Sequence, residues 1–515
     1  MTNPSAPTPV TPVDAPPGAV GERLGGPRVP VTGDLLSRLR SVCDRVDLDE
    51  GARLEAGRDW WPLAIRWATR GAVPALPALV ASPTDAGQVS AVLAACHEAR
   101  VPVTPVAGRS GVCGSSIPVF GGVSLDLCQV QGISDVDDAS LLADVLPGTF
   151  GPDLEAGLRE RRLTLGHWPQ SMELSTVGGW LACRGAGQYS TRYGKIEDMV
   201  VGLEVALADG RRIRTGGLGP RAATGPDLTQ LFVGSEGTLG VITSARLRLH
   251  PLPAGEGRRA FGFPGFPEGL EACRRILRRG ATPAVLRLYD GVETARNFDV
   301  TDRCALIVLD EADPGLLEAT LAVVDDEVGA AGGLPLDSGL VDRWTSHRND
   351  VSALAPLYRA GIVVDTIEIS ARWTALSGIY AKALEALRAI EGTLAASAHQ
   401  SHAYGDGACL YFTFAGRMPE SASPGAASPG PEGEDAWAEA YYERAWTAVI
   451  DVVDGAGGAI SHHHGIGLNR ARFMGRALGG GLEVLSSLKE ALDPRGILNP
   501  GKLGLPSPFG EVAWP

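Results

Sequence analysis

Glycines spaced three residues apart in Val101–Ser116 form a loop that could hold a phosphate group. The stretch reads VPVTPVAGRSGVCGSS, with glycine at positions 108, 111 and 114 after a short apolar run. Glycine lets the backbone approach a ligand closely, and successive N–H groups can converge on a diphosphate. A tight structural turn explains this stretch alone equally well, because glycine accounts for 67 of the 515 residues.

The triple histidine His462, His463 and His464 could supply acid–base groups to a substrate. In an extended run His462 and His464 face one side and His463 the other, so at most two of them meet one substrate. A solvated loop and a metal site are the alternatives. We expect no metal, because neither an H-x-x-E-H pattern nor a cysteine partner accompanies the histidines.

Arg287 lies on the polar side of a predicted strand over residues 284–290. Leu286 and Leu288 take the apolar face, which leaves Arg287 on the other face with its neighbours at 285 and 289. A guanidinium in that position can bind a phosphate or a carboxylate in a bidentate manner. Pairing with a surface carboxylate is the alternative.

Two further loops are rich in small and hydroxylated residues. Pro169-Gln170-Ser171 precedes Ser175-Thr176-Val177-Gly178-Gly179, and Gly234-Ser235-Glu236-Gly237-Thr238-Leu239-Gly240 feeds a predicted strand. Hydroxyls there can bond phosphate or sugar oxygens, and small residues leave room for a flat ring. Neither a strand–G-x-G-x-x-G–helix fingerprint nor a Walker lysine pattern occurs, so the diphosphate-type loop is of another kind. Each loop alone has a structural explanation, but the three together favour a cofactor site.

Composition narrows the class of protein. A net charge of −14 argues against a nucleic-acid partner, and 44% hydrophobic with 21% charged residues indicates a soluble globular chain. We expect neither a secretory signal nor a transmembrane span, because no apolar run approaches about 20 residues. Eight cysteines without a C-x-x-C pair suit a reducing cytoplasm. We therefore expect a cytoplasmic location, with peripheral membrane contact and a homodimer left open.

The elements that must position these residues form alternating helices and strands, which predicts an α+β fold. Expected helices cover residues 86–100, 152–162, 267–279, 315–330, 373–391 and 435–453, and expected strands cover 101–106, 123–127, 141–145, 200–208, 241–249, 284–290, 304–309 and 363–369. Residues 1–75 are predicted to be a disordered N-terminus (1–30) and a helical lead-in. Domains are expected over 76–252 and 253–455, with a disordered insert at 416–434, followed by a C-terminal segment 456–515 that returns to the first domain.

The motifs together resemble the FAD-binding oxidoreductases of the vanillyl-alcohol-oxidase type. The resemblance is carried by AGRSGVCGSS, the long stretch from WPQSMELSTVGGW to LEVALADG, GSEGTLGVIT and DPRGILNPGKL, and it spans residues 76–504. It implies a two-subdomain PCMH-type FAD-binding domain, then an α+β substrate (cap) domain. Within that superfamily, TLGH at 164–167, AVLRLYD at 284–290, HAYGDGACLYF at 402–412 and the triple histidine are most similar to alkyldihydroxyacetonephosphate synthases.

The resemblance implies which residues contact FAD. They come from the three loops and the segment between them: Ala107, Gly108, Arg109, Ser110, Gly111, Val112, Cys113, Gly114, Ser115, His167, Pro169, Gln170, Ser171, Ser175, Thr176, Gly178, Gly179, Arg184, Gly187, Gln188, Tyr189, Ser190, Glu236, Gly237, Leu239, Gly240, Val241 and Ile242. Some relatives attach the flavin through a histidine in the first loop. Val112 and Cys113 occupy that neighbourhood, so we expect non-covalent FAD.

The resemblance also implies the reaction. A synthase of this type exchanges the acyl group of acyl-dihydroxyacetone phosphate for a fatty alcohol without net redox, with Tyr404 as the catalytic tyrosine beside Arg287 and the three histidines. A tyrosine base needs a neighbouring cation, because a free phenol titrates at about 10. Where the resemblance is poor, at residues 357–373, Arg359 and Arg372 are candidate head-group contacts. The alternative is an FAD-dependent D-2-hydroxy-acid dehydrogenase or oxidase.

Overall fold

The computed structural model describes residues 11–16, 18–349, 354–419, 431–512 and 514. The chain divides into two compact units. The first unit comprises residues 1–186, 195–252 and 463–515, and the second comprises 187–194 and 253–462. Each unit combines sheets with helices, as the α+β prediction requires. No described helix combines the length and apolarity that crossing a bilayer demands.

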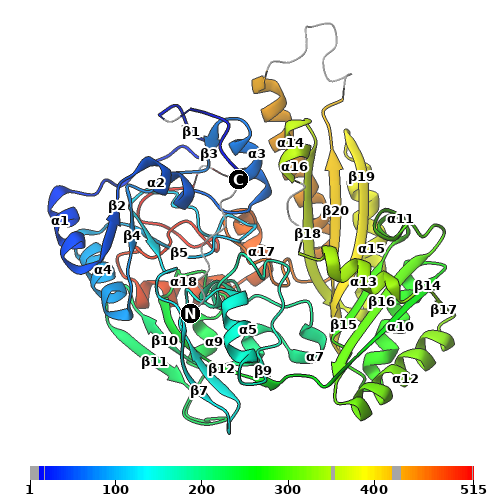
Figure 1. Cartoon of the computed structure of the whole chain (residues 1–515). Helices are drawn as coiled ribbons and strands as arrows, with labels where there is room; N and C mark the ends of the chain where they lie inside the picture. Colours follow the sequence, from blue (N-terminus) through cyan, green and yellow to red (C-terminus); the bar gives the residue numbers. More distant parts are fainter. Residues whose placement is uncertain (1–10, 17, 350–353, 420–430, 513, 515) are drawn as a thin grey trace, which may run out of the picture. The chain divides into compact units, whose positions relative to one another are not determined.

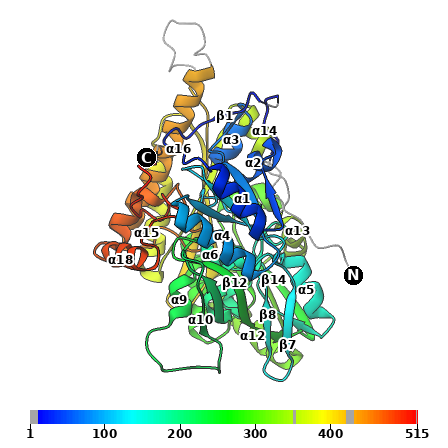
Figure 2. The same cartoon turned by 90° about the vertical axis from the view of Figure 1, so that its left-hand side faces the viewer.

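A four-stranded sheet carries the glycine-rich loop of the first unit. Its strand order is β2 (Arg45–Asp47), β4 (Leu79–Ser82), β6 (Val123–Asp126) and β5 (Val103–Val106), with β4, β6 and β5 parallel and β2 antiparallel. Helices α1 (Gly33–Val42) and α4 (Ala86–Ala99) pack against each other beside it (Figure 2). Asp85 caps α4 by accepting from the Gln88 N–H, which fixes where the chain enters this helix.

A five-stranded antiparallel sheet forms the other half of the first unit. Its order is β11 (Arg212–Gly216), β10 (Val200–Ala206), β12 (Val241–Arg248), β8 (Leu142–Val145) and β7 (Ile133–Asp137). One hydrophobic core joins α1 and α4 to both sheets, and it includes Ala206 and Val241 as well as Ile497 and Leu498 from the C-terminal segment. The remaining elements are α2 (Glu50–Ala56), α3 (Pro62–Ala68), α5 (Gly151–Arg159), β9 (Leu163–Thr164), α6 (Val177–Cys183), α8 (Ile196–Met199), α9 (Leu228–Phe232), β13 (His250–Pro251), η2 (Ala471–Phe473), α17 (Met474–Leu478) and α18 (Gly481–Leu492).

The N-terminal region differs from its predicted disorder. Strand β1 (Gly21–Glu22) pairs in parallel with β3 (Ala72–Val73), and the Arg28 guanidinium donates to the Val119 carbonyl at 2.6 Å. These contacts hold part of the Pro-rich start of the chain against the first unit. Low-complexity composition alone does not reveal such long-range partners. Residues 1–10 lie outside the described part of the chain.

The second unit is built on a seven-stranded antiparallel sheet (Figure 1). Its order is β17 (Leu334–Pro335), β14 (Gly255–Phe263), β16 (Cys304–Ala312), β15 (Val285–Tyr289), β19 (Thr393–Ala403), β20 (Gly407–Gly416) and β18 (Val363–Arg372). Helices α10 (Phe266–Arg278), α12 (Pro314–Ala330), α15 (Trp373–Arg388) and α16 (Pro431–Gly455) pack against the sheet or against one another. The shorter helices are α7 (Ser190–Tyr193), α11 (Gly291–Phe298), α13 (Gly339–His347) and α14 (Leu354–Arg359).

The insert predicted at 416–434 is shorter in the structure. Strand β20 continues to Gly416, and α16 begins at Pro431 rather than at 435. Residues 420–430 lie outside the described part of the chain. Two hydrogen bonds hold helix α16 against the sheet. The Tyr442 hydroxyl and the Trp446 ring N–H both donate to buried Asp365 on β18, at 2.6 and 3.2 Å.

The two faces of the large sheet differ in polarity. Leu288 on β15 packs under α10, where a Cβ added to Gly269 would lie 2.4 Å from the Leu288 side chain. The opposite face carries a row of cross-strand neighbours: Tyr289 on β15, His399 on β19, Tyr411 on β20 and Glu368 on β18. The predicted alternation of Leu286 and Leu288 with Arg287 therefore holds, and it gives the second unit one polar face.

Candidate functional site

The glycine-rich loop of the first unit follows β5 and is shaped for an anion. A Cβ on Gly108 would lie 2.2 Å from the Leu174 carbonyl oxygen, so only glycine fits there. Gly114 and Arg109 both have positive φ, +78° and +54°. Within the described residues, the successive N–H groups of 109–112 have no protein acceptor. Such a run of unpaired donors is an anion-binding nest, and this loop therefore fits the diphosphate of FAD.

A buried carboxyl group supports this loop from below. Asp59 is fully buried and accepts from the Trp61 N–H at 3.1 Å and from the Ser116 hydroxyl at 3.4 Å. Burial raises the pKa of Asp59 to about 7, against the lowering effect of these hydrogen bonds and of Lys502. The sequence analysis did not single out Asp59, which precedes two tryptophans and offers no motif of its own.

In the second predicted loop, the hydroxyl groups of Ser175 and Thr176 form hydrogen bonds within the protein. The Ser175 hydroxyl donates to the Ser171 carbonyl at 2.8 Å and accepts from the Trp180 ring N–H at 2.6 Å, while Thr176 caps α6. Both hydroxyl groups therefore take part in hydrogen bonds within the protein. Of the others in this loop, Pro169 is half-buried, and Gln170 and Gly179 are exposed.

A buried polar group, His167, lies two residues before this loop. It is 0% exposed, its ring lies 4.6 Å from that of Trp180, and both ring nitrogens lack a hydrogen-bond partner among the described residues. Burial lowers the pKa of His167 to about 3. A neutral imidazole with one free donor and one free acceptor suits a polar cofactor edge. His167 and the anion nest are the observations that make this unit fit FAD.

Glu236 joins the third loop to the segment after the triple histidine. Its carboxylate accepts from the N–H groups of Ile466 at 2.6 Å and Gly467 at 2.9 Å, and its φ is +50°. Burial raises the pKa of Glu236, and these two N–H groups with Lys502 and Arg470 offset part of that rise. The structure thus gives this predicted cofactor contact an anchoring role. Residues 237–240 complete the turn, and Val241 and Ile242 begin β12.

The C-terminal DPRGILNPGK motif ties these loops together. Buried Asn499 donates through Nδ2 to the carbonyls of Ser115 and Glu236, at 2.9 and 2.7 Å. The Lys502 ammonium donates to the Ile117 carbonyl at 2.7 Å, and burial lowers the pKa of Lys502 to about 7. The sequence analysis quoted this motif without assigning it a role. Asn499 therefore links the first loop to the third, and Lys502 binds the residues that follow the first loop.

The residues of the segment Arg184–Ser190 belong to two different units. Arg184 ends α6 in a left-handed conformation, is exposed and pairs with Glu197 at 3.3 Å. Gly187, Gln188, Tyr189 and Ser190 belong to the second unit. The Ser190 hydroxyl lies 2.8 Å from His402 Nδ1 and 3.0 Å from the Tyr404 hydroxyl.

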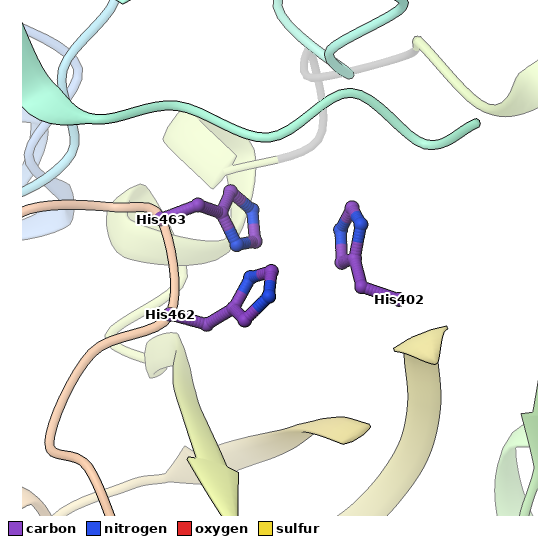
Figure 3. Close-up of side chains that lie close together, drawn as sticks. All are labelled: His402, His462 and His463. Carbon is purple, nitrogen blue, oxygen red and sulfur yellow. The ribbon is translucent and has the colours of Figure 1, made fainter. Parts of the chain in front are cut away.

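Tyr404 lies in a chain of hydrogen-bonding groups on the polar face of the second unit. Its hydroxyl is 3.0 Å from His462 Nε2, and the rings of His402 and His462 stack with centroids 4.9 Å apart (Figure 3). The backbone N–H of His462 donates to buried Glu368 at 2.5 Å, which fixes the start of the triple histidine. The structure therefore brings together two of the residues predicted to be catalytic, Tyr404 and His462.

Arg287 belongs to a second cluster on the same face. Its Nη2 lies 2.7 Å from His399 Nε2, and His399 Nδ1 lies 2.7 Å from the Glu293 carboxylate. An arginine only donates, so Nε2 accepts and the proton of His399 sits on Nδ1. Burial lowers the pKa of His399, and the Glu293 carboxylate acts in the opposite direction. No sequence pattern had indicated His399, His402 or Glu293 as site residues, although His402 begins the HAYGDGACLYF motif.

The guanidinium of Arg287 is not paired with any carboxylate that the structure describes. No carboxylate oxygen lies within 4 Å of it among the described residues, its Nη1 is 3.4 Å from the Ser401 hydroxyl, and its buried Nε has no partner. The rings of Tyr289 and Trp344 lie 5.3 and 6.0 Å from it. Among the described residues the surface ion pair that was the alternative in the sequence does not occur, which leaves the cation available to an anion.

The other predicted residues are His463, His464, Arg359 and Arg372. His463 and His464 open the last segment of the first unit, with ring centroids 4.5 Å apart. The chain bends at residues 462–464, so the facing argument for an extended run does not apply to the triple histidine. Arg359 ends α14 and Arg372 precedes α15, both with exposed side chains.

Comparison with known protein families agrees with this two-part organisation. Residues 77–216 match the model described as "FAD binding domain". Residues 257–503 match the model described as "FAD linked oxidases, C-terminal domain". The second match crosses from the second unit into the last segment of the first.

The chain is also similar to several individual proteins. It is 29% identical over 472 residues to an alkyldihydroxyacetonephosphate synthase of Dictyostelium discoideum, covering 84% of this chain and 74% of that protein. It is 30% identical over 443 residues to the uncharacterized FAD-linked oxidoreductase YgcU of Escherichia coli O157:H7, covering 83% and 89%. Glycolate oxidase subunit GlcD of Bacillus subtilis is 28% identical over 495 residues, covering 92% and 97%.

A solved structure shares the fold. An alkyldihydroxyacetonephosphate synthase superposes with a TM-score of 0.75 at 24% identity, over 96% of this chain and 89% of that one. The family matches, the relatives and the fit of the glycine-rich loop agree on the cofactor, which is FAD. The chain belongs to the family of FAD-linked oxidoreductases, in which an FAD-binding domain is joined to the C-terminal domain of the FAD-linked oxidases.

Proposed function

We propose that the protein exchanges the acyl group of an acyl-dihydroxyacetone phosphate for a long-chain alcohol, as an alkyldihydroxyacetonephosphate synthase-like transferase. The observation that carries this proposal is the polar face of the second unit. It joins an arginine without a carboxylate partner to a tyrosine–histidine pair. Similarity to synthases of that name supports it.

The reaction balances without an external oxidant. The bond between C1 of the dihydroxyacetone and the ester oxygen breaks, and the fatty acid leaves as its carboxylate. A bond then forms between C1 and the alcohol oxygen, and the alcohol proton is released. One proton is taken from C1 and returned during the exchange, so the protein needs a group that holds a proton and gives it back.

Tyr404 and His462 are the groups we assign to that proton. The phenol oxygen of Tyr404 faces His462 Nε2 at 3.0 Å, so a proton taken at the phenol oxygen has an acceptor in reach. Glu368 fixes the backbone of His462, and both reacting side chains are half-buried. This arrangement lets the pair meet a substrate on one side while its protein contacts hold it in place.

Arg287 is the group we assign to the phosphate or the departing carboxylate. Its orientation is set by His399, which is held in turn by Glu293. FAD, when bound, would lie on the glycine-rich loop and beside His167, and it would supply an electron-accepting ring. The protein's own contribution is to bind the anion, to move the proton and to position the alcohol.

A direct assay tests the proposal. Purified FAD-loaded protein is given an acyl-dihydroxyacetone phosphate and a long-chain alcohol, and the released fatty acid and the ether product are measured. We expect both products in equal amounts, without bleaching of the flavin after turnover. Hydrolysis of the ester without ether formation contradicts the transferase.

A second candidate function is oxidation of a D-2-hydroxy acid. The chain spans 97% of GlcD of Bacillus subtilis, against 74% of the Dictyostelium synthase. Arg287 would then bind the substrate carboxylate, and His462 would accept the hydroxyl proton. Anaerobic mixing with glycolate, D-lactate and longer 2-hydroxy acids separates the two functions, because only this candidate reduces and bleaches the flavin.

Replacement of Arg287 tests its role under either function. Arg287→Ala removes a charge-assisted contact to the anion, which costs about 2–3 kcal/mol, so kcat/KM falls roughly 30- to 150-fold. Arg287→Lys keeps the charge but loses the two parallel N–H donors of the guanidinium, so we expect an activity between those of the alanine variant and the wild type. Arg274→Ala is the matched control, since that arginine pairs with Glu271 on exposed α10. Equal losses in the two alanine variants would refute an anion-binding role.

A further inference from the structure

We propose that Ser190 and His402 extend Tyr404 into a proton relay of four side chains, His402–Ser190–Tyr404–His462. The inference rests on the proton-handling role proposed for Tyr404, and it assigns a positioning and relay role to Ser190, a residue that the sequence pattern pointed to only as a flavin contact. All four residues belong to the second unit.

The relay follows from three consecutive contacts. His402 Nδ1 lies 2.8 Å from the Ser190 hydroxyl, the Ser190 hydroxyl 3.0 Å from that of Tyr404, and the latter 3.0 Å from His462 Nε2. Each distance is that of a hydrogen bond. Two imidazoles, each able to accept or to donate, therefore stand at the two ends of a pair of hydroxyls.

Two arrangements of this chain place every hydroxyl hydrogen along it. In both, Ser190 and Tyr404 each donate to one neighbour in the chain and accept from the other. In the first arrangement His462 donates to Tyr404, Tyr404 to Ser190 and Ser190 to His402. In the second every bond is reversed. Moving three hydrogens by one bond each converts the first into the second and transfers one proton from His462 to His402, so in this conversion His462 starts as the imidazolium and His402 ends as one.

The first arrangement also provides a path for a substrate proton. When the Tyr404 oxygen takes a proton from the substrate, its own hydrogen passes to Ser190, and the Ser190 hydrogen passes to His402 Nδ1. His402 then carries the positive charge as an imidazolium until the proton returns. The stacked rings of His402 and His462 lie 4.9 Å apart (Figure 3), so two positive charges there repel each other and the relay holds one excess proton.

Helix α7 is fastened so that Ser190 stays in place. The Thr191 hydroxyl accepts from the Ala403 N–H at 3.2 Å, next to both His402 and Tyr404. Arg192 pairs with Asp310 at 3.1 Å, and the Tyr193 hydroxyl donates to Glu311 at 2.6 Å, both on β16. Each of the four residues of α7 thus contacts the large sheet or the residues after it. Ser190 and His402 are 2% and 3% exposed, so water does not replace the contact between them.

The test compares three variants in the FAD-loaded protein. Ser190→Ala removes the relay hydroxyl, and Ser190→Thr keeps one. Thr393→Val is the matched control, because Thr393 also places a hydroxyl 3.0 Å from a tyrosine, Tyr441, on the same strand as His402 but without a histidine. The readout that needs no substrate is the absorbance titration of the Tyr404 phenol, taken as the difference from Tyr404→Phe.

The relay predicts a specific pattern in that titration. In Ser190→Ala the Tyr404 phenol loses a donor to its ionised form and titrates at higher pH, Ser190→Thr restores the wild-type value, and Thr393→Val does not change it. With substrate, kcat falls about tenfold or more in Ser190→Ala while KM stays the same. An unchanged phenol titration in Ser190→Ala, or an equal shift in Thr393→Val, overturns the relay.

Two further measurements keep the test decisive. Should Ser190→Ala not fold, as judged by flavin absorbance and melting temperature, His402→Asn removes the far acceptor and is expected to slow turnover to the same degree. Should neither substrate class turn over, the proposed function fails, but the shifted titration in Ser190→Ala still supports the relay. The two failures are therefore distinguishable.

Discussion

At the scale of single residues, buried polar groups without hydrogen-bond partners lower the stability of the folded protein. His167 is the clearest example, because a buried imidazole without partners must stay neutral. An unfolded chain, by contrast, protonates its histidines near pH 6.5. A group of this kind ties stability to pH, and it also identifies where a ligand can contribute hydrogen bonds.

This difference predicts a pH dependence of stability. Burial lowers the pKa of folded His167 to about 3, so between pH 6.5 and 3 the unfolded chain binds more protons and stability falls as the pH falls. From pH 7 to pH 5 the loss is about 2 kcal/mol. We expect His167→Phe, which keeps the ring, to remove this loss while weakening FAD binding. Thermal melting at the two pH values measures the first effect and flavin titration of apoprotein the second.

The matched control for this prediction is His347, which is exposed on α13. His347→Gln is expected to leave both the pH dependence and the flavin affinity unchanged. A His167→Phe variant that melts with the wild-type pH dependence would show that the buried ring is not the source of the effect.

At the scale of elements, short segments at the end of the chain determine the shape of the first unit's loops. The Lys489 ammonium on α18 is buried and donates to the Asp493 carboxylate at 2.6 Å and to the carbonyls of Thr238 and Leu498. Asp493 in turn accepts from the N–H groups of Ile497 and Leu498. This one ion pair joins the last helix to the turn that contains Glu236.

Breaking this pair is expected to be costly. Lys489→Met leaves a buried carboxylate without its cation, which destabilises by about 3–5 kcal/mol. The melting temperature falls, and FAD affinity falls with it, because Asn499 no longer holds the glycine-rich loop. The exposed pair Lys195–Asp198 provides the comparison, since removing Lys195 is expected to cost at most about 1 kcal/mol. A Lys489→Met protein that melts like the wild type would refute the role of this segment.

The sequence allowed some of these elements to be predicted better than others. The face of β15 that carries Arg287 was predictable, because apolar and polar side chains alternate along this strand. Leu286 and Leu288 need an apolar neighbour, and α10 provides one. The contact between Ser190 and His402 spans 212 residues, and a register irregularity in β19 between Gln400 and Ala403 precedes it. No local pattern encodes such a meeting. The start of the triple histidine is held in the same way by Glu368, which is 94 residues from His462.

At the scale of the whole molecule, the family matches and the two units give the protein an FAD-binding part and a part that carries the proposed catalytic groups. The first unit presents its anion nest in main-chain atoms, and the loop around Val112 lacks a histidine that could bond the flavin. Cys113 is buried and its carbonyl accepts from Leu468. Both features are those of a site that binds its cofactor reversibly.

Reversible binding has a simple outcome. Acid precipitation of the yellow protein is expected to release the flavin into the supernatant and to leave a colourless pellet, because no covalent bond links the two. The comparison is a flavoprotein with a histidyl flavin treated in parallel, whose pellet keeps its colour. A yellow pellet from this protein would place a covalent attachment in the molecule, and Cys113→Ser would then identify whether that thiol forms it.

The assignment of Gly187–Gly194 to the second unit has a consequence for protein engineering. These eight residues lie inside the sequence that matches the FAD-binding model, yet α7 contacts β15 and β19. A chimaera joined at residue 252 would take the sheet from one parent and Ser190 from the other. A chimaera that exchanges substrate preference between relatives therefore has to take α7 and the seven-stranded sheet from the same parent.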